Sequence, residues 1–274
     1  MGAAVRSEAC LGSWELFARR PHPLLRRHVL GGYTGYREDM LAATRRVEVP
    51  HPGIVVIVSL GPAIAVKGRA QTSFVAGLHE VPVTTEHTGR QLGIQVNFTP
   101  LGARMLLGLP MRELTGHVVG LDALLGREGA SLGERLAALP GWPARFDALD
   151  AFLLARLSEA PAPRPDVGYA WSRLAAADGA VPVGALCDEL GCSRRHLSAR
   201  FGEEVGLAPK AMARVLRFNR AVARVRAGDD LAAVAAACGY YDQSHLTREF
   251  GALAGLPPAA YAAAQAPVGR GVAP

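Results

Sequence analysis

Two stretches of the chain carry polar side chains at the same helical spacing, 49 residues apart. Positions i, i+1, i+4 and i+5 of an α-helix lie on one face. These positions are occupied by Arg194, Arg195, Ser198 and Ala199 in the first stretch and by Gln243, Ser244, Thr247 and Arg248 in the second. An arginine fork can form two hydrogen bonds with guanine O6 and N7, and a glutamine amide can do so with adenine N6 and N7. Both faces therefore carry side chains suited to base edges, although Ala199 offers at most a methyl contact to thymine.

The apolar residues within both stretches indicate how these faces are oriented. Each stretch has an apolar pair at i and i+4, which we expect to face inward and to leave the polar face outside. The pairs are Leu197 with Phe201 and Leu246 with Phe250. Before each stretch a short apolar helix ends at a glycine, Gly191 or Gly239, and a polar N-cap follows, Ser193 or Asp242. This order of elements predicts a helix-turn-helix, whose second helix can enter a major groove.

One long helix is predicted between the two motifs. The sequence PKAMARVLRFNRAVARVRAG gives roughly 18 helical residues, or about 27 Å. Because one turn of B-DNA is about 34 Å, the two second helices can reach successive major grooves on one side of a duplex. The segment from Ser193 to Arg226 holds nine Lys and Arg against two Glu, and such a basic stripe favours phosphate binding.

A second group of residues lies where phosphates rather than base edges are expected. We predict phosphate-binding or positioning roles for Ser193, His196, Arg217, Arg220 and His245. Two alternatives stay open for the arginine row of the long helix. It is a solvated face, or Arg217 is structural and pairs with an acidic neighbour such as Glu203 or Glu249. For the two histidines the alternative is a structural role.

Residues 183 to 262 resemble the DNA-binding domain of the AraC/XylS family of transcriptional regulators. The resemblance rests on GCSRRHLSARFGEEVGLAP, on RVLRFNRA and above all on AAVAAACGYYDQSHLTREFGALAGLPPAAY. The chain departs from the family pattern at Tyr240 and Leu246, where phenylalanine is frequent, and both changes keep the core apolar. The resemblance implies sequence-specific binding of double-stranded DNA, with base contacts at Arg195, Ser198 and Ala199 in the first motif. It also implies RNA polymerase and a second copy of the chain as partners.

The first half of the chain has a different pattern, β-like and then helical. Short β-branched runs bounded by Gly and Pro are typical of antiparallel strands, and here they are TRRVEVP, GIVVIVSL, AIAVKG, TSFVAG and QLGIQVNF. From Pro100 the spacing becomes helical, and Ser131 is a candidate N-cap. The predicted fold class is α+β in two domains: a β-rich, cupin-like sandwich or barrel with a helical appendage, then an all-α double helix-turn-helix joined by a long linking helix. Residues 92–126 resemble the N-terminal domain of some AraC-type regulators, which implies sensing of a small-molecule effector or dimerisation.

A proline-rich segment, SEAPAPRPDVG at residues 158 to 168, separates the two halves, because proline ends helices. The predicted division is an effector-sensing or dimerisation domain at 1–160, a linker at 161–168, a DNA-binding domain at 169–265 and a flexible tail at 266–274. The two motifs within the DNA-binding domain span about 183–205 and 231–254. We expect each half to bury a core of its own.

Other features of the sequence bear on where the chain works. No apolar run reaches the ~20 residues of a membrane span, and the N-terminus has no apolar segment typical of a secretory signal. The four cysteines, Cys10, Cys187, Cys192 and Cys238, show neither CxxC pairing nor the density of a disulfide scaffold. This usage predicts a cytoplasmic protein with reduced thiols and no membrane partner.

The alternative function is a DNA-binding module fused to a catalytic N-terminal domain, either a repair domain or a metal-dependent cupin-like domain. An alkylation-repair domain needs a zinc-bound cysteine cluster, and the first 165 residues offer only Cys10. The histidines of that half form no HxH or HxxxH cluster beside a carboxylate, and they are His22, His28, His51, His79, His87 and His117. Hydrolase and nucleotide motifs are also missing. We therefore predict a regulator without catalytic residues, metal or cofactor; against a purely architectural DNA binder, the two polar faces favour base readout.

Overall fold

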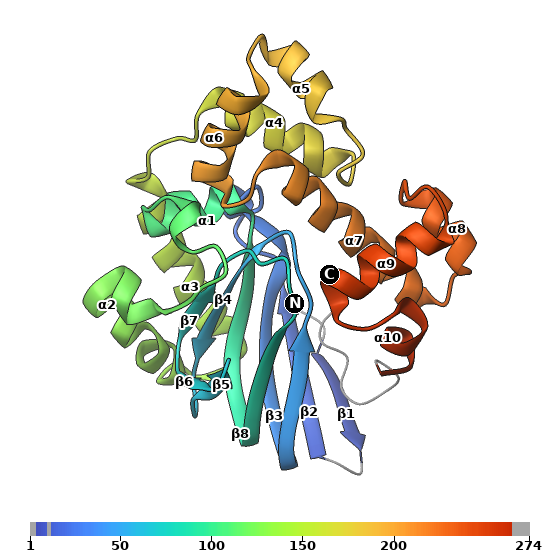
Figure 1. The fold of residues 1–274 in the computed structure, drawn as a ribbon. Coiled ribbons are helices and arrows are strands. Elements are labelled where there is room, and N and C mark those ends of the chain that lie inside the picture. Colours follow the sequence, from blue (N-terminus) through green and yellow to red (C-terminus); the bar gives the residue numbers. More distant parts are fainter. Residues whose placement is uncertain (1–3, 10–11, 265–274) are drawn as a thin grey trace.

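The structure, a computed structural model, describes residues 4–9 and 12–264 of the 274-residue chain. A curved β-sheet forms the N-terminal half together with three α-helices and two short 3₁₀ helices, and the remaining helices lie across the upper end and one flank of this sheet (Figure 1). The strands are β1 (Ala4–Ala9), β2 (Gly12–Arg19), β3 (Val29–Glu48), β4 (Ile54–Ser59), β5 (Ile64–Val66), β6 (Arg69–Gln71), β7 (Phe74–Ala76), β8 (Val83–Phe98) and β9 (Val118–Gly120). The N-terminal helices are η1 (Pro23–Leu25), α1 (Pro100–Leu107), η2 (Met111–Glu113), α2 (Leu121–Ala137) and α3 (Gly141–Ser158). The C-terminal helices are α4 (Pro165–Ala176), α5 (Val183–Leu190), α6 (Arg194–Val205), α7 (Pro209–Ala227), α8 (Leu231–Ala237), α9 (Gln243–Ala254) and α10 (Pro258–Ala264).

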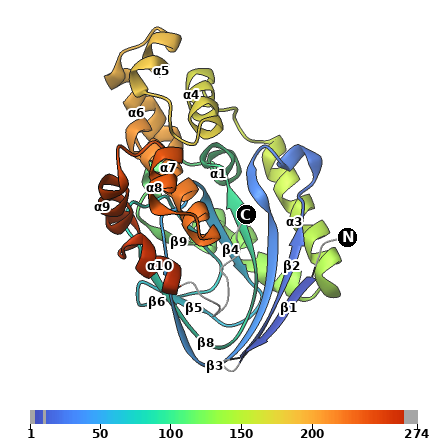
Figure 2. The ribbon, with the colours of Figure 1, turned by 90° about the vertical axis from the view of Figure 1, so that its right-hand side faces the viewer.

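The sheet is antiparallel and is organised around its two longest strands, β3 and β8. The strand order is β1-β2-β3-β8-β4-β7-β9. Outside this path, β5 pairs with both β8 and β6. The β3–β8 pairing runs from Val29 opposite Phe98 to Glu48 opposite Val83, with register shifts that interrupt it twice. Such irregularities increase the local twist and bend of a strand pair. The strands curve into a nearly closed barrel (Figure 2), and this β-rich half with an all-helical second half confirms the predicted fold class.

The predicted strands are all present, but the sheet also contains strands that the sequence pattern did not indicate. These are β1, β2, β6, β9 and the first halves of β3 and β8. The segment GYTGYREDM of β3 mixes glycine with charged residues, which have weak intrinsic β preference. It is extended because it pairs with β2 on one side and β8 on the other, with Tyr36 opposite both Leu16 and Gly93.

Two expectations about helix boundaries are wrong. Ser131 is not an N-cap, because α2 begins at Leu121, bends at Gly126 and passes through Ser131, whose hydroxyl donates to the carbonyl of Glu128 at 3.5 Å. The linker predicted at 161–168 is shorter, because α4 begins at Pro165. Proline is favoured in the first turn of a helix, where its missing N–H would have no partner. The predicted tail, 266–274, lies outside the described residues.

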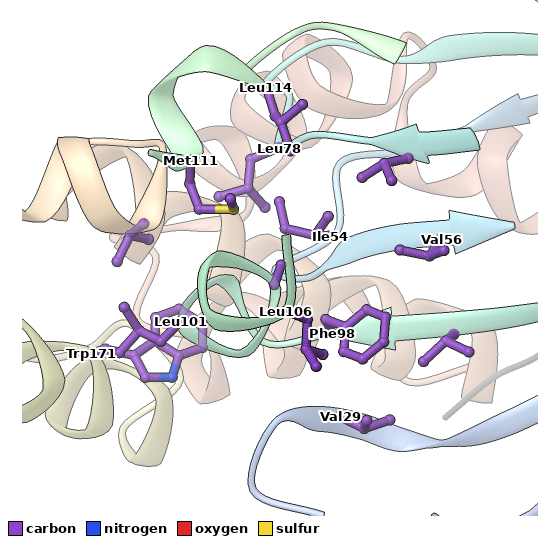
Figure 3. Close-up of a cluster of buried hydrophobic side chains, with 14 of the residues drawn as sticks. Val29, Ile54, Val56, Leu78, Phe98, Leu101, Leu106, Met111, Leu114 and Trp171 are labelled. Carbon is purple, nitrogen blue, oxygen red and sulfur yellow. The ribbon is translucent and has the colours of Figure 1, made fainter. Parts of the chain in front are cut away.

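The buried side chains form one large cluster, one smaller cluster and a third set of four residues on the strands (Ile57, Val66, Phe74 and Val83), rather than one core for each half. The large cluster runs from the sheet (Ile54, Phe98) through α1 (Leu101) to Trp171 of α4 and on to Phe201 of α6 (Figure 3). It therefore crosses the 159–164 connection without a break. The smaller cluster has Phe218, Val222, Val234, Leu246, Phe250 and Tyr261 among its members and belongs to the end of the chain.

A buried carboxylate marks the place where α6 meets the N-terminal half. Glu204, only 1% exposed, lies 3.6 Å from the Arg104 guanidinium of α1 and 3.4 Å from that of Arg164, and it accepts a hydrogen bond of 3.1 Å from the Arg164 N–H. Beside it, the Thr115 hydroxyl donates to the Gly206 carbonyl at 2.7 Å. Gly206 has φ +100°, and a Cβ there would come within 2.9 Å of Thr115, so glycine is required by conformation and by space.

The C-terminal half has two lobes, one around each predicted helix-turn-helix motif. The second lobe contacts the N-terminal half through different groups. The Asn219 amide of α7 donates to the carbonyl of Pro50 at 2.7 Å. Val49 packs against the smaller cluster, and Pro82 lies against Gly255. The N-terminal half therefore touches both lobes of the C-terminal half, each at its own place.

We predict that Glu204→Gln lowers the free energy of unfolding by roughly 1–3 kcal/mol, because it leaves two arginines beside a neutral group. The lower end of this range allows for the partial exposure of both arginines. Urea denaturation of the full chain measures the change. Glu203→Gln is the matched control on the same helix, since Glu203 is partly exposed and makes no ion pair with the described residues. Equal effects of the two substitutions would contradict a specific role for the Glu204 carboxylate.

Candidate nucleic-acid interface

The first helix-turn-helix consists of α5 and α6, joined by a three-residue turn. Gly191 adopts the left-handed conformation (φ 60°, ψ 33°). The Cys192 N–H then donates to the Cys187 carbonyl at 3.0 Å, and the Gly191 N–H donates to Asp188 at 3.3 Å. These two bonds define a Schellman motif, which ends α5 and reverses the chain. Ser193 starts α6 as its N-cap, with its hydroxyl accepting from the His196 N–H at 3.2 Å.

The face of α6 that points away from the core is the one that the sequence predicted. Leu197 and Phe201 are fully buried. The outward residues are Arg194, Arg195, His196 and Ala199, which are exposed, and Ser198, which is half-buried. Arg195 makes no hydrogen bond or ion pair with any described residue. An arginine that is exposed and without a partner near a helix start is available for a base edge or a phosphate.

The second helix-turn-helix consists of α8 and α9 and repeats this design with one difference. Gly239 again has a positive φ, 74°, and the Tyr240 N–H donates to the Ala235 carbonyl at 3.0 Å. Asp242 is the N-cap of α9 and accepts from the His245 N–H at 2.7 Å. Between Tyr240 and Asp242 the chain carries one additional residue, Tyr241, for which the first turn has no equivalent.

The outward face of α9 is likewise open. Leu246 and Phe250 are fully buried, whereas Gln243, Ser244 and Arg248 are exposed and Thr247 is half-buried. Within the described part of the chain, no hydrogen bond or ion pair holds Gln243 or Arg248. The two faces predicted from the sequence are thus both solvent-accessible and carry donors.

Tyr241 is a residue that sequence reasoning missed. Tyr241 is 93% exposed, the largest exposed fraction among the large hydrophobic residues that the structure describes, and it stands directly before the N-cap of α9. Its backbone N–H donates to His245 Nδ1 at 3.2 Å. Its ring and hydroxyl make no hydrogen bond or aromatic contact with any described residue. The available signal was a change in repeat offset, from 48 between Cys192 and Tyr240 to 49 between Ser193 and Asp242.

His245 lies inside the turn rather than on the outer face. Besides accepting the Tyr241 N–H, its ring meets Tyr240 edge-on at 5.3 Å, and its Nε2 lies 3.8 Å from Glu249. Of the two roles left open for this histidine, these contacts correspond to the structural one.

The arginine row of α7 is paired with carboxylates. Arg217 lies 3.3 Å from Glu249 and over the Tyr240 ring at 5.7 Å. Arg220, which is more exposed, lies 3.4 Å from Asp178. Burial raises the pKa of the Tyr240 hydroxyl, and the charge of Glu249 raises it further while Arg217 lowers it. Arg217 therefore supports the second turn through Glu249 and Tyr240. The pairing with Glu249 is one of the alternatives that the sequence left open.

Among the histidines of the N-terminal half, His87 is buried beside a carboxylate. His87 lies 3.1 Å from the buried Glu38 carboxylate, which also accepts from Arg46 at 2.8 Å. Hydrogen bonding from His87 and the charge of Arg46 outweigh burial and lower the pKa of Glu38. Over the described residues, no group of three or more His, Cys, Asp and Glu side chains is placed to share a metal ion. None of the helices in this described part combines the length and apolar character needed to cross a bilayer.

Comparison with known families assigns two parts of the chain. Residues 186–264 match a family described as a helix-turn-helix domain, and residues 18–120 match a domain of unknown function, DUF6597. No curated protein matches the chain.

Several solved structures are similar to the chain at low sequence identity. An apo variant of ToxT from Vibrio cholerae strain SCE256 is 13% identical, with 86% of this chain and 98% of that chain covered and a TM-score of 0.49. Wild-type ToxT from the same strain with an unsaturated fatty acid bound is 12% identical, with 82% and 96% covered and a TM-score of 0.46. The C-terminal domain of AraT, a response regulator from Geobacillus stearothermophilus, is 16% identical, with 40% and 95% covered and a TM-score of 0.36.

The matched region begins at Leu186 inside α5 and contains the rest of the first motif, the whole of α7 and the second motif, which is the arrangement that the resemblance to AraC/XylS regulators implied. The C-terminal part of the chain is therefore a helix-turn-helix domain of the AraC type, and it follows a match to a domain of unknown function.

Proposed function

We propose that the chain binds specific DNA sequences through α6 and α9 and regulates transcription from the bound site. The observation that carries this proposal is the pair of open polar faces, each on the second helix of a helix-turn-helix in a single chain. Arg194, Arg195, Ser198 and Ala199 face one major groove, and Gln243, Ser244, Thr247 and Arg248 face the next. Genome-wide mapping of bound DNA tests the proposal, and a uniform distribution without a shared sequence would contradict it.

The N-terminal half supplies the regulation in this proposal. It touches both lobes of the DNA-binding part, at Glu204 and at Asn219, so a change in its shape bears on both recognition helices. A cavity of about 380 Å³ lies between the end of β4 and α2, with Ser59, Ser73, Asp122 and Glu134 in its lining. Small-molecule sites commonly measure roughly 300–1,000 Å³. These features support modulation by a small polar effector.

The remaining partners follow from the same role. We place the chain in the cytoplasm, as a homodimer through the N-terminal half that acts on RNA polymerase without a catalytic activity or cofactor of its own. Sedimentation of the full chain at micromolar concentration tests the dimer, and a strict monomer would contradict it.

The first prediction for this function concerns base recognition. Replacing Arg195, Gln243 or Arg248 by alanine is expected to cost about 1–3 kcal/mol on the best site and to relax preference at one base pair. Competition binding against a library of single-base variants measures both effects. Arg69→Ala is the control, because it removes an exposed arginine from β6 in the N-terminal half. A loss of affinity that is the same on all sequences would assign the residue to a phosphate instead.

The two arginines of α7 are expected to behave differently. Arg220→Ala is expected to weaken binding to specific and scrambled DNA alike and to reduce the slope of log K against log salt by about one. Arg217→Ala is expected to lower stability by roughly 1 kcal/mol, because Glu249 then loses a partly buried partner. Binding over a salt series and urea denaturation separate the two. An unchanged slope and affinity for Arg220→Ala would mean that this residue contacts no phosphate.

Tyr241 is assigned to the same interface. An aromatic ring at this exposed position, next to the start of α9, can lie against a deoxyribose while its hydroxyl donates to a phosphate. Tyr241→Phe is expected to lose about 1 kcal/mol of binding free energy, a typical value for one hydrogen bond. Tyr241→Ala is expected to lose more, with the fold unchanged by circular dichroism. Full affinity in Tyr241→Ala would remove this residue from the interface.

A further inference from the structure

Two cysteine side chains meet in the turn of the first helix-turn-helix. In a Schellman motif the residue three positions inside the helix end and the second residue beyond it are joined by a backbone hydrogen bond, and their side chains usually touch. In α5 these two residues are Cys187 and Cys192, joined by the N–H to carbonyl bond of 3.0 Å. The place that usually holds an apolar contact thus holds two thiols, and both are free.

The second motif shows that this pairing is not needed for the fold. There the same two positions are occupied by Ala235 and Tyr240, joined by a bond of the same length, 3.0 Å. The third described cysteine, Cys238, lies next to the turn glycine but is 4% exposed and belongs to the smaller hydrophobic cluster. The two turns therefore share this backbone hydrogen bond, and only the first has a pair of sulfur atoms at its two ends.

The two thiols differ in their access to solvent. Cys187 is 7% exposed, whereas Cys192 is only half-buried. Burial raises the pKa of the Cys187 thiol, and the neighbouring Cys192 thiol raises it further. The Arg194 guanidinium acts in the opposite direction on the same thiol. A soluble oxidant therefore reaches Cys192 first, with Cys187 placed behind it as the resolving thiol.

We propose that Cys187 and Cys192 form a dithiol site that hydroperoxides oxidise to a reversible disulfide. In the first step the Cys192 sulfur attacks the peroxide, the O–O bond breaks, a sulfenic acid forms on Cys192, and an alcohol or water leaves. In the second step the Cys187 sulfur attacks the sulfenic sulfur, the S–O bond breaks, and water leaves. Two thiols are oxidised, one peroxide is reduced, and a thiol such as dithiothreitol reverses the change.

The position of the site links this chemistry to α6. Cys192 directly precedes Ser193, the N-cap, and Arg194 and Arg195 form the first turn that follows. A disulfide has an S–S length of about 2.05 Å and a restricted dihedral angle, so its formation pulls the turn toward the end of α5. The outward side chains at the start of α6 then move relative to α9, which the cross-link does not touch.

Peptide mapping of the full chain tests the site. The protein is treated with hydrogen peroxide, free thiols are blocked by alkylation, and the tryptic fragment that contains both cysteines is weighed. We expect this fragment to lose two hydrogen atoms and to resist alkylation until dithiothreitol is added, while Cys238 remains reduced. Two alkylatable thiols after peroxide treatment would overturn the proposal, as would a disulfide that forms only in urea.

Two variants separate the roles of the thiols. Cys187→Ala is expected to accumulate a sulfenic acid at Cys192 that dimedone captures, because the resolving thiol is gone. Cys192→Ser is expected to leave Cys187 reduced, because its sulfur is buried. Oxidation of Cys187 in folded Cys192→Ser would overturn the proposed order of events. Circular dichroism confirms that both variants remain folded.

The link to DNA has its own readout. Peroxide is expected to lower the affinity of the wild-type chain for its site several-fold, with recovery on reduction and no effect in Cys192→Ser. Unchanged affinity in a chain whose disulfide is demonstrated by mass would overturn the link to α6. A reduced chain that binds no DNA would instead contradict the proposed function, while the mass result still decides the dithiol site.

Discussion

Helix α7 belongs to two hydrophobic cores at once, and the geometry of the DNA-binding part depends on this. Met212, Val215 and Leu216 are buried in the large cluster with the first motif, whereas Phe218 and Val222 are buried in the smaller cluster with the second. An α-helix is stiff, and each residue adds about 1.5 Å and about 100° of rotation. The distance and the relative rotation of α6 and α9 are therefore fixed within one chain by the residues of α7 between its two buried faces.

The N-terminal half is attached to this arrangement through contacts of two kinds. At α6 the contact is a buried carboxylate between two arginines, which is sensitive to charge and to small displacements. At α7 it is a neutral amide bound to a backbone carbonyl, supported by Val49 and Pro82. Because the large cluster continues from the sheet into the first lobe, that lobe is held more extensively than the second. A change in the barrel is therefore expected to reach the two recognition helices unequally.

The local features of the helix-turn-helix part could be predicted from the sequence because they depend on neighbouring residues. Gly191, Gly239, Ser193 and Asp242 lie where the pattern placed them, since left-handed glycines and N-caps are satisfied within a few residues. Long-range pairings could not be predicted. Glu204 of α6 pairs with Arg104 of α1, far away along the chain, and β2 is extended because it pairs with β3. Tyr241 was missed because a single repeat offset conceals a one-residue difference in the turn.

The longer turn before α9 makes the two halves of the DNA-binding part unequal in shape as well as in side chains. A symmetric dimer of identical motifs can bind a palindromic site in either direction with the same result. A single chain with Arg194 and Arg195 at one end and Gln243 and Arg248 at the other has a polarity, so its site has a left and a right. Inverting that site would keep the affinity but turn the N-terminal half toward the opposite side of the promoter, and with it every neighbouring protein that this half can reach.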